Sequence, residues 1–267
     1  MKRLVIVVLA SILSMTVFAE GYQVNLLSTK QTGMGHVGTG MKLGAESMHF
    51  NPAGLVFLRT NMDFSLGISA IMAKAKYSYD GYSAKTDNPV GTPLYAYAGF
   101  KIYDNLAAGI SLTTPYGNSL KWPKNWAGAG LIQDISLKSY VIQPTLSYKI
   151  TDRLSIGVGL QLAWGNVNLS RALMGASDLQ GIGTKFESLL PLLAGVPSNI
   201  IPDADKQAMQ EMVALMKGTE VPPAYARLEG NAHMRVGFNV GIMYDICDKV
   251  TVGLSYRSKI KMRVKEG

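Results

Sequence analysis

The sequence predicts an all-β protein, specifically a transmembrane antiparallel β-barrel of which about seven strands are present. The first observation is a series of segments in which apolar and polar residues alternate, which is the period of a β-strand. The second is that charged residues make up 16% of the chain, against about a quarter in a soluble domain. The third is that no stretch beyond residue 20 is apolar enough, over the roughly 20 residues required, to cross a membrane as a helix.

Residues 1–19 have the organisation of a signal peptide. Lys2 and Arg3 precede the apolar segment 4–17, and the chain reaches a small-x-small cleavage motif that ends at Ala19. We therefore expect export and cleavage after Ala19, which lowers the formal charge from +8 to +6 because two basic residues are removed. Nucleic-acid binding is not expected, since the remaining basic residues form no single patch flanked by aromatic residues.

Residues 20–58 form a glycine-rich leader that ends in Asn51-Pro52-Ala53-Gly54-Leu55. The spacing Gly33-x-Gly35-x-x-Gly38 matches that of a dinucleotide-binding loop. We exclude a nucleotide site, because no hydrophobic strand precedes this spacing and no βαβ unit surrounds it. The glycines instead indicate a backbone that turns tightly in a confined space.

The segments beyond the leader have a two-residue period. They cover residues 63–73, 93–102, 106–114, 140–150, 154–165, 235–244 and 250–264. One face of these segments is apolar with aromatic residues near its ends, and the other carries mostly small and polar residues. A water-soluble β protein would bury the apolar face, whereas a membrane barrel turns that face toward lipid, so alternation alone fits both.

The connections favour the membrane barrel for residues 59–267. Tight turns alternate with long loops, which is typical of short periplasmic turns opposite long external loops. The turns are residues 103–105, 151–153 and 245–249, and the loops are residues 74–92, 115–138 and about 170–234.

The loop at 170–234 is predicted to be partly helical. Residues 203–217 place Met209 and Met212 in one apolar stripe at helical spacing. Asp203 and Lys217 stand at the ends that the helix dipole favours. One interpretation is a helix packed on the barrel rim. The other is an apolar, methionine-rich groove that captures lipid-like molecules, since methionine adapts to varied shapes.

Several stretches together resemble the FadL family of outer-membrane transporters of long-chain fatty acids and related hydrophobic compounds. They are the start Gly21-Tyr22-Gln23-Val24-Asn25, the tripeptide Asn51-Pro52-Ala53 between the glycine-rich leader and the first strand, and Tyr256-Arg257-Ser258 in a strand near the end. Arg171 stands where this family has a basic residue at the end of its fifth strand. The resemblance runs over nearly all of residues 21–267.

The resemblance implies a fourteen-stranded barrel in the cell outer membrane, plugged by an N-terminal hatch that corresponds to residues 20–58. Residues 59–267 would then form the N-terminal half of the barrel. We expect the chain to be part of a longer protein, since about seven strands alone would leave two unpaired edges in lipid. We also expect a monomer.

The resemblance further implies passive transport: capture at the external loops, transfer to a pocket in the barrel, and lateral release at a kink in the third strand. Here that strand is residues 106–114. Gly109 and Pro115 either support a local break or are ordinary strand-end residues. Asn51, Pro52 and Ala53 would hold the end of the hatch against the same strand.

The polar face of the last segment is strongly basic and suits a carboxylate ligand. Arg257, Lys259, Lys261 and Arg263 share this face, and we expect Arg171 near the pocket mouth. A guanidinium offers a carboxylate two parallel hydrogen bonds, which makes Arg257 the favoured interior residue. Lys261 and Arg263 are instead expected at the external rim, facing water or lipopolysaccharide phosphate. Outer-membrane lipid is therefore an expected partner.

The main alternative is an aromatic-hydrocarbon channel of the same fold, which would not need a cationic clamp. A general porin or a structural barrel is another, although a glycine-rich plug disfavours an open channel. An outer-membrane enzyme is disfavoured because none of the three histidines, His36, His49 and His233, stands beside a nucleophile or acid motif. We expect no catalytic residue, no cofactor and no metal, and the lone Cys247 is most simply a tolerated thiol.

Overall fold

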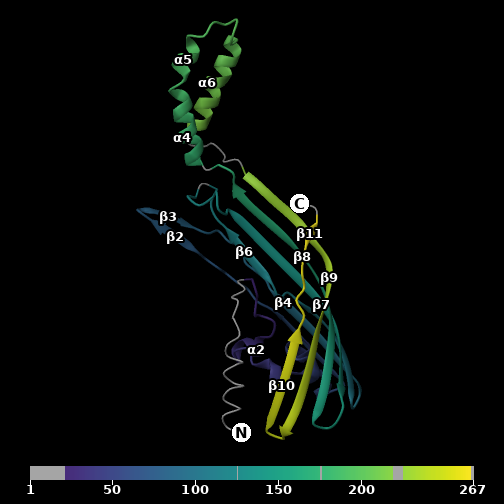
Figure 1. Ribbon diagram of the computed structural model, residues 1–267. Helices are drawn as coiled ribbons and strands as arrows, with labels where there is room; N and C mark the ends of the chain where they lie inside the picture. Colours follow the sequence, from purple (N-terminus) through teal and green to yellow (C-terminus); the bar gives the residue numbers. More distant parts are fainter. Residues whose placement is uncertain (1–21, 125, 175, 219–224, 266–267) are drawn as a thin grey trace, which may run out of the picture.

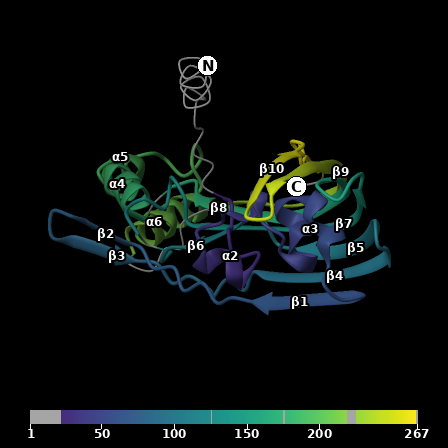
Figure 2. The ribbon, with the colours of Figure 1, turned by 90° about the horizontal axis from the view of Figure 1, so that it is seen from below.

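An antiparallel sheet curves around a small helical hatch in the computed structural model of the protein (Figures 1 and 2). The structure describes residues 22–124, 126–174, 176–218 and 225–265, so the expected signal peptide at 1–19 lies outside the described residues. The strands follow the order β1-β4-β5-β7-β8-β9-β10, with β6 paired to β7 and β11 paired to β9. The hairpin β2–β3 forms a separate sheet in the first long loop.

The strands of the curved sheet have the following bounds: β1 Met62–Ile68, β4 Leu94–Tyr103, β5 Leu106–Thr113, β6 Gly117–Lys121, β7 Asp134–Lys149, β8 Leu154–Ala172, β9 Tyr225–Cys247, β10 Val250–Arg257 and β11 Val264–Lys265. The hairpin consists of β2 Lys76–Tyr79 and β3 Tyr82–Lys85. Every predicted strand segment is present in the structure, which confirms the all-β prediction.

The two faces of the sheet are inverted relative to a water-soluble protein. The concave face, which holds the hatch, buries polar side chains, and Ser155 and Gln161 are 0% and 4% exposed. The convex face exposes large apolar side chains, and Leu66 is 80% exposed. Such a surface is stable only against lipid, because apolar area of this extent would aggregate in water. The inversion therefore supports the membrane-barrel interpretation over the soluble one.

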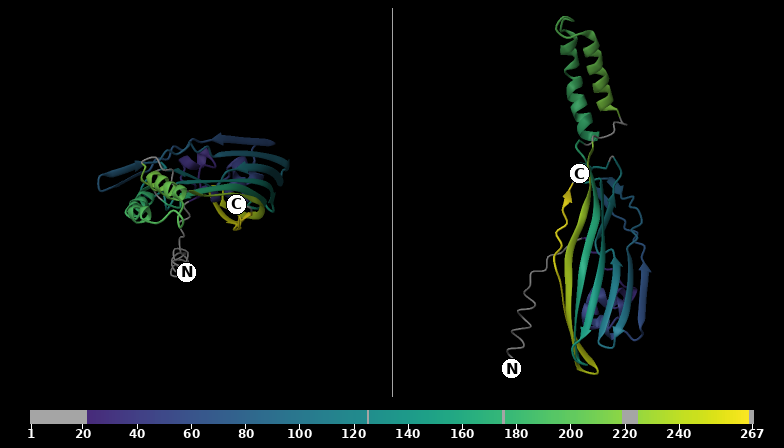
Figure 3. Two further views of the ribbon diagram at one scale, coloured as in Figure 1. Left: turned by 90° about the horizontal axis from the view of Figure 1, so that it is seen from above. Right: turned by 90° about the vertical axis from the view of Figure 1, so that its right-hand side faces the viewer.

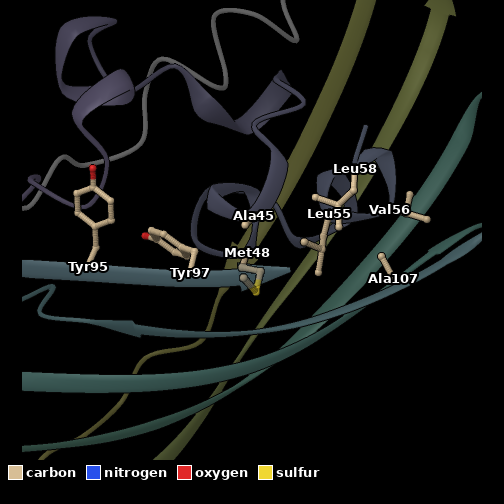
Figure 4. Packing of buried hydrophobic residues seen from close by; sticks show 8 residues of the cluster. All are labelled: Ala45, Met48, Leu55, Val56, Leu58, Tyr95, Tyr97 and Ala107. Atoms are coloured by element: carbon tan, nitrogen blue, oxygen red, sulfur yellow. The ribbon is translucent and has the colours of Figure 1, made fainter. Parts of the chain in front are cut away.

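The hatch fills the concave side with short helical turns. These are α2 Thr29–Gly33, η1 Gly38–Gly40, η2 Gly44–Glu46, α3 Ser47–Phe50 and η3 Pro52–Phe57. An apolar cluster joins the hatch to β4 and β5 (Figure 4) and consists of Ala45, Met48, Leu55, Val56, Leu58, Tyr95, Tyr97 and Ala107. The core of the described chain thus lies inside the curve, between the hatch and the wall.

A pair of stacked aromatic rings marks a level on the convex face. Tyr140 of β7 and Trp164 of β8 lie opposite each other, with ring centroids 5.8 Å apart. Aromatic residues of this kind flank the apolar belt of a membrane barrel. Beyond the pair the convex face becomes polar, with the register pairs Lys138–Asn166, Ser136–Asn168 and Asp134–Ser170.

The concave face changes in the opposite sense at the same level. Beyond the aromatic pair it carries an apolar patch that we call the upper lumen, formed by Leu120, Ile135, Leu137, Val167, Leu169 and Leu228. Side chains alternate between faces along a strand, so β7 and β8 reverse their apolar face beyond the aromatic pair. The upper end of the barrel is therefore apolar inside and polar outside.

A helical hairpin projects beyond the outer end of the sheet (Figure 3). It consists of α4 Ala176–Glu187, α5 Leu190–Ala194 and α6 Asp203–Lys217. The bounds of α6 are the predicted ones. Among the described residues, none of the helices is long and apolar enough to cross a membrane.

Several predicted boundaries were wrong at the outer end. The loop predicted at about 170–234 begins only after Ala172 and ends before Tyr225, and the loop predicted at 115–138 contains β6 and the start of β7. The predicted strand 250–264 ends at Arg257, and pairing with β9 resumes only at Val264. Between them, Ile260 lies over Gly237 of the concave face, so residues 258–263 do not continue the face of Arg257.

Candidate functional site

The wall of the barrel is interrupted between β5 and β6. Both strands pair with β7, but over separate stretches of it, residues 141–148 and 134–138. Thr114, Pro115 and Tyr116 lie in between, and Pro115 has no N–H to donate to a ladder. β4 pairs with β5 up to the break, where the Thr114 backbone N–H donates to Leu94 O at 3.2 Å. β4 has no register pair with β6.

A cavity of about 350 Å³ occupies this interruption. It is lined by Val24 of the hatch, residues 90–94 before and at the start of β4, Thr114, residues 116–119 and residues 136–140. Ser139 belongs to the concave face and is buried, whereas Tyr140 belongs to the convex face. The cavity is therefore lined by residues from both faces of the wall.

The N-terminal end of the hatch lies along the break. The Val24 backbone N–H donates to Pro115 O at 2.8 Å, and the Gly117 N–H donates to Tyr22 O at 3.0 Å. Gln23 forms an isolated antiparallel bridge with Tyr116. Residues 22–24 thus take the position that a neighbouring strand would have.

Gly109 lies in intact pairing rather than at the break. It pairs with Gly99 on one side and Thr145 on the other, so of the two alternatives considered for Gly109 the structure shows the ordinary strand residue and not a local break. A Cβ at this position would lie 2.6 Å from Met48 Sδ of the hatch and 2.7 Å from Ala98 O. Glycine is required there because the hatch approaches the backbone closely.

Asn51 fastens the end of the hatch to the wall. Its buried side chain donates from Nδ2 to Thr39 O of the hatch at 2.8 Å and to Ile242 O of β9 at 3.1 Å. Its Oδ1 accepts a hydrogen bond from the Ala53 N–H at 3.1 Å. The carbonyl of Ala53 in turn accepts from Ser147 Oγ at 3.2 Å and Ser155 Oγ at 3.0 Å.

These hydrogen bonds run to β7, β8 and β9, which corrects the expectation that the tripeptide binds the third strand. Glycines in these strands leave the space that the tripeptide occupies. A Cβ at Gly157 would overlap the backbone of Pro52, and a Cβ at Gly241 would overlap Asn51 Oδ1. Below them, Lys42 Nζ forms an ion pair with Asp245 at 2.7 Å. The hatch is therefore held tightly at this end and by a few backbone bonds at the break.

Arg257 lies inside the curve at the end of β10. Its guanidinium donates to the carbonyl of His49, and its Nη1 lies 3.3 Å from His49 Nε2. Burial, and next the charge of Arg257, holds the pKa of His49 well below its ordinary value. A neutral His49 accepts from the guanidinium and leaves its charge uncompensated. Among the residues that the structure describes, no carboxylate forms an ion pair with Arg257.

The predicted ligand-binding residues Arg171 and Lys259 do not lie beside Arg257. Arg257 is level with Asn239 and Gly159 in the register, and Arg171 lies at the outer end of β8. The two residues are about 40 Å apart along the strand direction, at roughly 3.3 Å per residue. Lys259 is exposed, outside the strand. Arg171 and Arg257 therefore cannot bind the same carboxylate.

The helical hairpin contains the predicted apolar groove. Its volume is about 420 Å³, and its lining consists of Phe186, Leu189, Leu190, Leu192, Leu193, Met209, Met212, Val213 and Met216. Lys217 Nζ and Glu187 form an ion pair at 2.5 Å that joins α6 to α4. The helical hairpin that carries this groove lies beyond the outer end of the sheet (Figure 3).

Met212→Glu should weaken capture in this groove. A carboxylate among apolar side chains makes transfer of an alkyl chain from water less favourable. We expect a long-chain alkyl probe to bind the protein several-fold more weakly. Gln210→Glu is the matched control, because Gln210 is exposed on the same helix and outside the groove. Equal effects of the two variants would contradict a role for the groove.

Sequence reasoning missed two parts of the site. Residues 22–24 were not expected at the wall break, and His49 was not expected to contact Arg257. The buried Glu46, which accepts from Ser28 Oγ at 2.5 Å and Ser65 Oγ at 2.6 Å, was also missed. The only available signal for Glu46 was an acidic residue within an otherwise small and apolar stretch.

The whole sequence from residue 10 to 267 matches the profile of a family described as "Outer membrane protein transport protein (OMPP1/FadL/TodX)". The chain belongs to this family. Long-chain fatty acid transport proteins of Escherichia coli strain K12 and Salmonella typhi are each 25% identical over 264 residues. These matches cover 97% of the chain but 56% and 54% of the relatives, so the chain spans about half the length of the curated relatives it matches.

Solved structures of family members share the fold. A FadL homologue from Pseudomonas aeruginosa superimposes with a TM-score of 0.60 at 18% identity, covering 90% of this chain and 53% of its own. The toluene transporter TodX of Pseudomonas putida superimposes with a TM-score of 0.54 at 21% identity, covering 82% and 52%. The curved sheet with its hatch thus has the fold of part of an outer-membrane β-barrel of this family.

Proposed function

We propose that this chain belongs to a passive outer-membrane channel for long-chain fatty acids or similar hydrophobic molecules, which releases its substrate sideways through the break between β5 and β6. The observation that carries the proposal is the cavity that touches both faces of the wall at this break. Three further features support it: the apolar groove of the helical hairpin, the apolar upper lumen, and the hatch that is fastened below them.

The apolar surfaces follow one another from outside to inside. The groove of α4–α6 offers a first binding surface, and the upper lumen continues it below the external loops. Leu137 belongs both to the upper lumen and to the lining of the break. A hydrophobic molecule on this path keeps apolar contact instead of entering water, so no energy source is needed.

The hatch makes it unfavourable for a substrate to leave through the lower end of the barrel, on the side opposite the helical hairpin. Asn51, Ala53 and Lys42 fasten it to strands β7 to β9, and the glycines of these strands leave no space around it. Exit through the break would displace residues 22–24 and the hydrogen bonds between Tyr116 and Ser139, and would leave the rest of the hatch in place. A porin-like channel would instead need the whole hatch to leave.

A carboxylate substrate is favoured over a neutral aromatic one by Arg257. A half-buried guanidinium without an anionic partner is unfavourable, and a fatty-acid carboxylate would compensate its charge. TodX is named as a toluene transporter and shares the fold, so uptake of neutral aromatic compounds is the second candidate. The assignment as a transporter rather than an enzyme follows the family description.

Gly117→Trp tests lateral release. Gly117 lines the break, and a Cβ there would lie 3.5 Å from Leu137 O and 3.7 Å from Val24 Cγ2, which are ordinary contacts. The indole would fill the cavity without displacing the strand. In cells that carry the full-length protein, we expect fatty-acid uptake to fall at least about tenfold, while binding to the purified protein is retained.

Gly130→Trp is the matched control, since Gly130 is exposed and outside the break. Normal uptake by the Gly117→Trp protein would contradict lateral release at this position. A large ion conductance of the wild-type protein in planar bilayers without substrate would contradict the whole proposal and favour a porin.

A further inference from the structure

A second cavity lies on the convex face, just beyond the level of Tyr140 and Trp164. Its volume is about 330 Å³, and we call it the outer pocket. It is lined by Asp87, Asn88, Pro89, Ser119, Lys121, Asp134, Ser136 and Asn168. The strand residues among them belong to the polar outer face of β6, β7 and β8.

The outer pocket is built by a segment of the first long loop that runs along the free edge of β6. The Asp87 backbone N–H donates to Lys121 O at 2.8 Å, and Asn88 Oδ1 accepts from the Lys121 N–H at 2.7 Å. Asn88 Nδ2 also donates to Ala73 O at 3.0 Å. These bonds fix residues 87–89 as one wall of the pocket, and the sheet forms the other.

The lining identifies the chemistry of a ligand. It contains two carboxylates, one ammonium group, two carboxamides and two hydroxyls. A phosphate alone would meet more negative than positive charge, so it is disfavoured. A group with many hydroxyls suits this lining, because it both donates to the carboxylates and accepts from the ammonium and amide groups.

The height of the outer pocket identifies the source of such a group. Aromatic residues mark the interface of a membrane barrel. The nearest strand residues of the pocket, Ser136 and Asn168, are four positions beyond this level, so the pocket lies on the headgroup side of the interface. We propose that the outer pocket binds the sugar headgroup of an outer-leaflet glycolipid, with the acyl chains of that lipid against the apolar belt below. The proposal rests on the outer-membrane orientation of the barrel and not on the substrate.

The outer pocket and the break share Pro89, Ser119 and Ser136 in their linings. A glycolipid bound there would cover the outer opening of the break from the side of the headgroups. This lipid would prevent water from entering the break while the hydrocarbon region below stays open to a departing substrate. The outer pocket is therefore a lipid site that is separate from the transport path but adjoins it.

Native mass spectrometry of the full-length protein tests the proposal, with hexa-acylated lipid A as the probe in its diphosphorylated and dephosphorylated forms. We expect both forms to bind, because the pocket recognises the sugars. Ser136→Phe fills the centre of the pocket and should lower the bound fraction at least about tenfold. Asn166→Phe is the matched control, since Asn166 is exposed on the same face of β8 and outside the pocket.

Asp134→Asn provides a second test that does not depend on filling the pocket. Loss of a carboxylate that accepts from sugar hydroxyls should weaken both forms of lipid A. Stronger binding of the diphosphorylated form to Asp134→Asn would overturn the proposal in favour of a phosphate site. Equal lipid A binding by wild type and Ser136→Phe would overturn it as well, even if the Gly117→Trp experiment supports lateral release.

Discussion

Gly241→Val is expected to detach the end of the hatch from the wall and to lower the stability of the full-length protein. Any Cβ at this position overlaps Asn51 Oδ1 and approaches Pro52 Cδ to 2.9 Å. Neither Asn51 nor the backbone of β9 can move away, because Asn51 is fully buried and β9 is paired with both β8 and β10. Overpacking of this kind costs about 1–3 kcal/mol, and loss of the Asn51 hydrogen bond to Ile242 O adds to it.

The measurement is the thermal unfolding of the protein in detergent, together with proteolysis of the hatch in intact outer membranes. We expect a lower Tm and cleavage of the hatch from the periplasmic side. Gly181→Val is the matched control, because no atom lies within 4 Å of a Cβ at Gly181. An unchanged Tm and a protected hatch in Gly241→Val would show that the tripeptide does not fasten the hatch.

Arg257→Met is expected to weaken long-chain fatty-acid binding at least about tenfold and to leave toluene binding unchanged. A hydrogen bond to a charged group contributes about 1.5–3 kcal/mol, and toluene has no charge to be compensated. The fold should be retained, because no described carboxylate loses an ionic partner and the methionine fills most of the same space. The measurement is the binding of both ligands to the purified full-length protein.

Two controls accompany this variant. Arg263→Met removes the same charge from an exposed position beyond β10 and should have no effect on binding. Arg257→Lys keeps a charge but loses the two parallel hydrogen bonds of a guanidinium, so its affinity should be intermediate. If fatty acid binds Arg257→Met as tightly as wild type, the carboxylate lies elsewhere and neutral hydrophobic compounds become the favoured substrates.

Within the apolar belt, alternation in the sequence was sufficient to place the strands. Along β8, Ile156, Val158 and Leu160 are exposed and the residues between them are buried, as expected of a wall between lipid and a plug. Beyond Tyr140 the apolar residues of β7 change from even to odd positions, at Ile135 and Leu137. A pattern search that assumes one apolar face throughout ends each strand at this reversal, which is why the outer ends were predicted as loops.

The candidate site was predictable in its parts and not in its contacts. The structure places Asn51-Pro52-Ala53 and Arg257 inside the curve and the predicted methionines in the groove, and their roles stay predictions. Which strand each residue would meet depends on pairing over long sequence separations, and local alternation carries no information about this. Residues 258–264 illustrate the limit, because their alternation continues although the chain leaves the sheet after Arg257.

The hydroxyls of Ser147 and Ser155, which donate to the carbonyl of Ala53, have a consequence for the order of assembly. Their partner lies in a segment that is synthesised about a hundred residues earlier, a long separation for a contact to form. These two bonds therefore cannot form until both β7 and β8 have been synthesised, so this attachment of the hatch depends on strands that follow it in the chain.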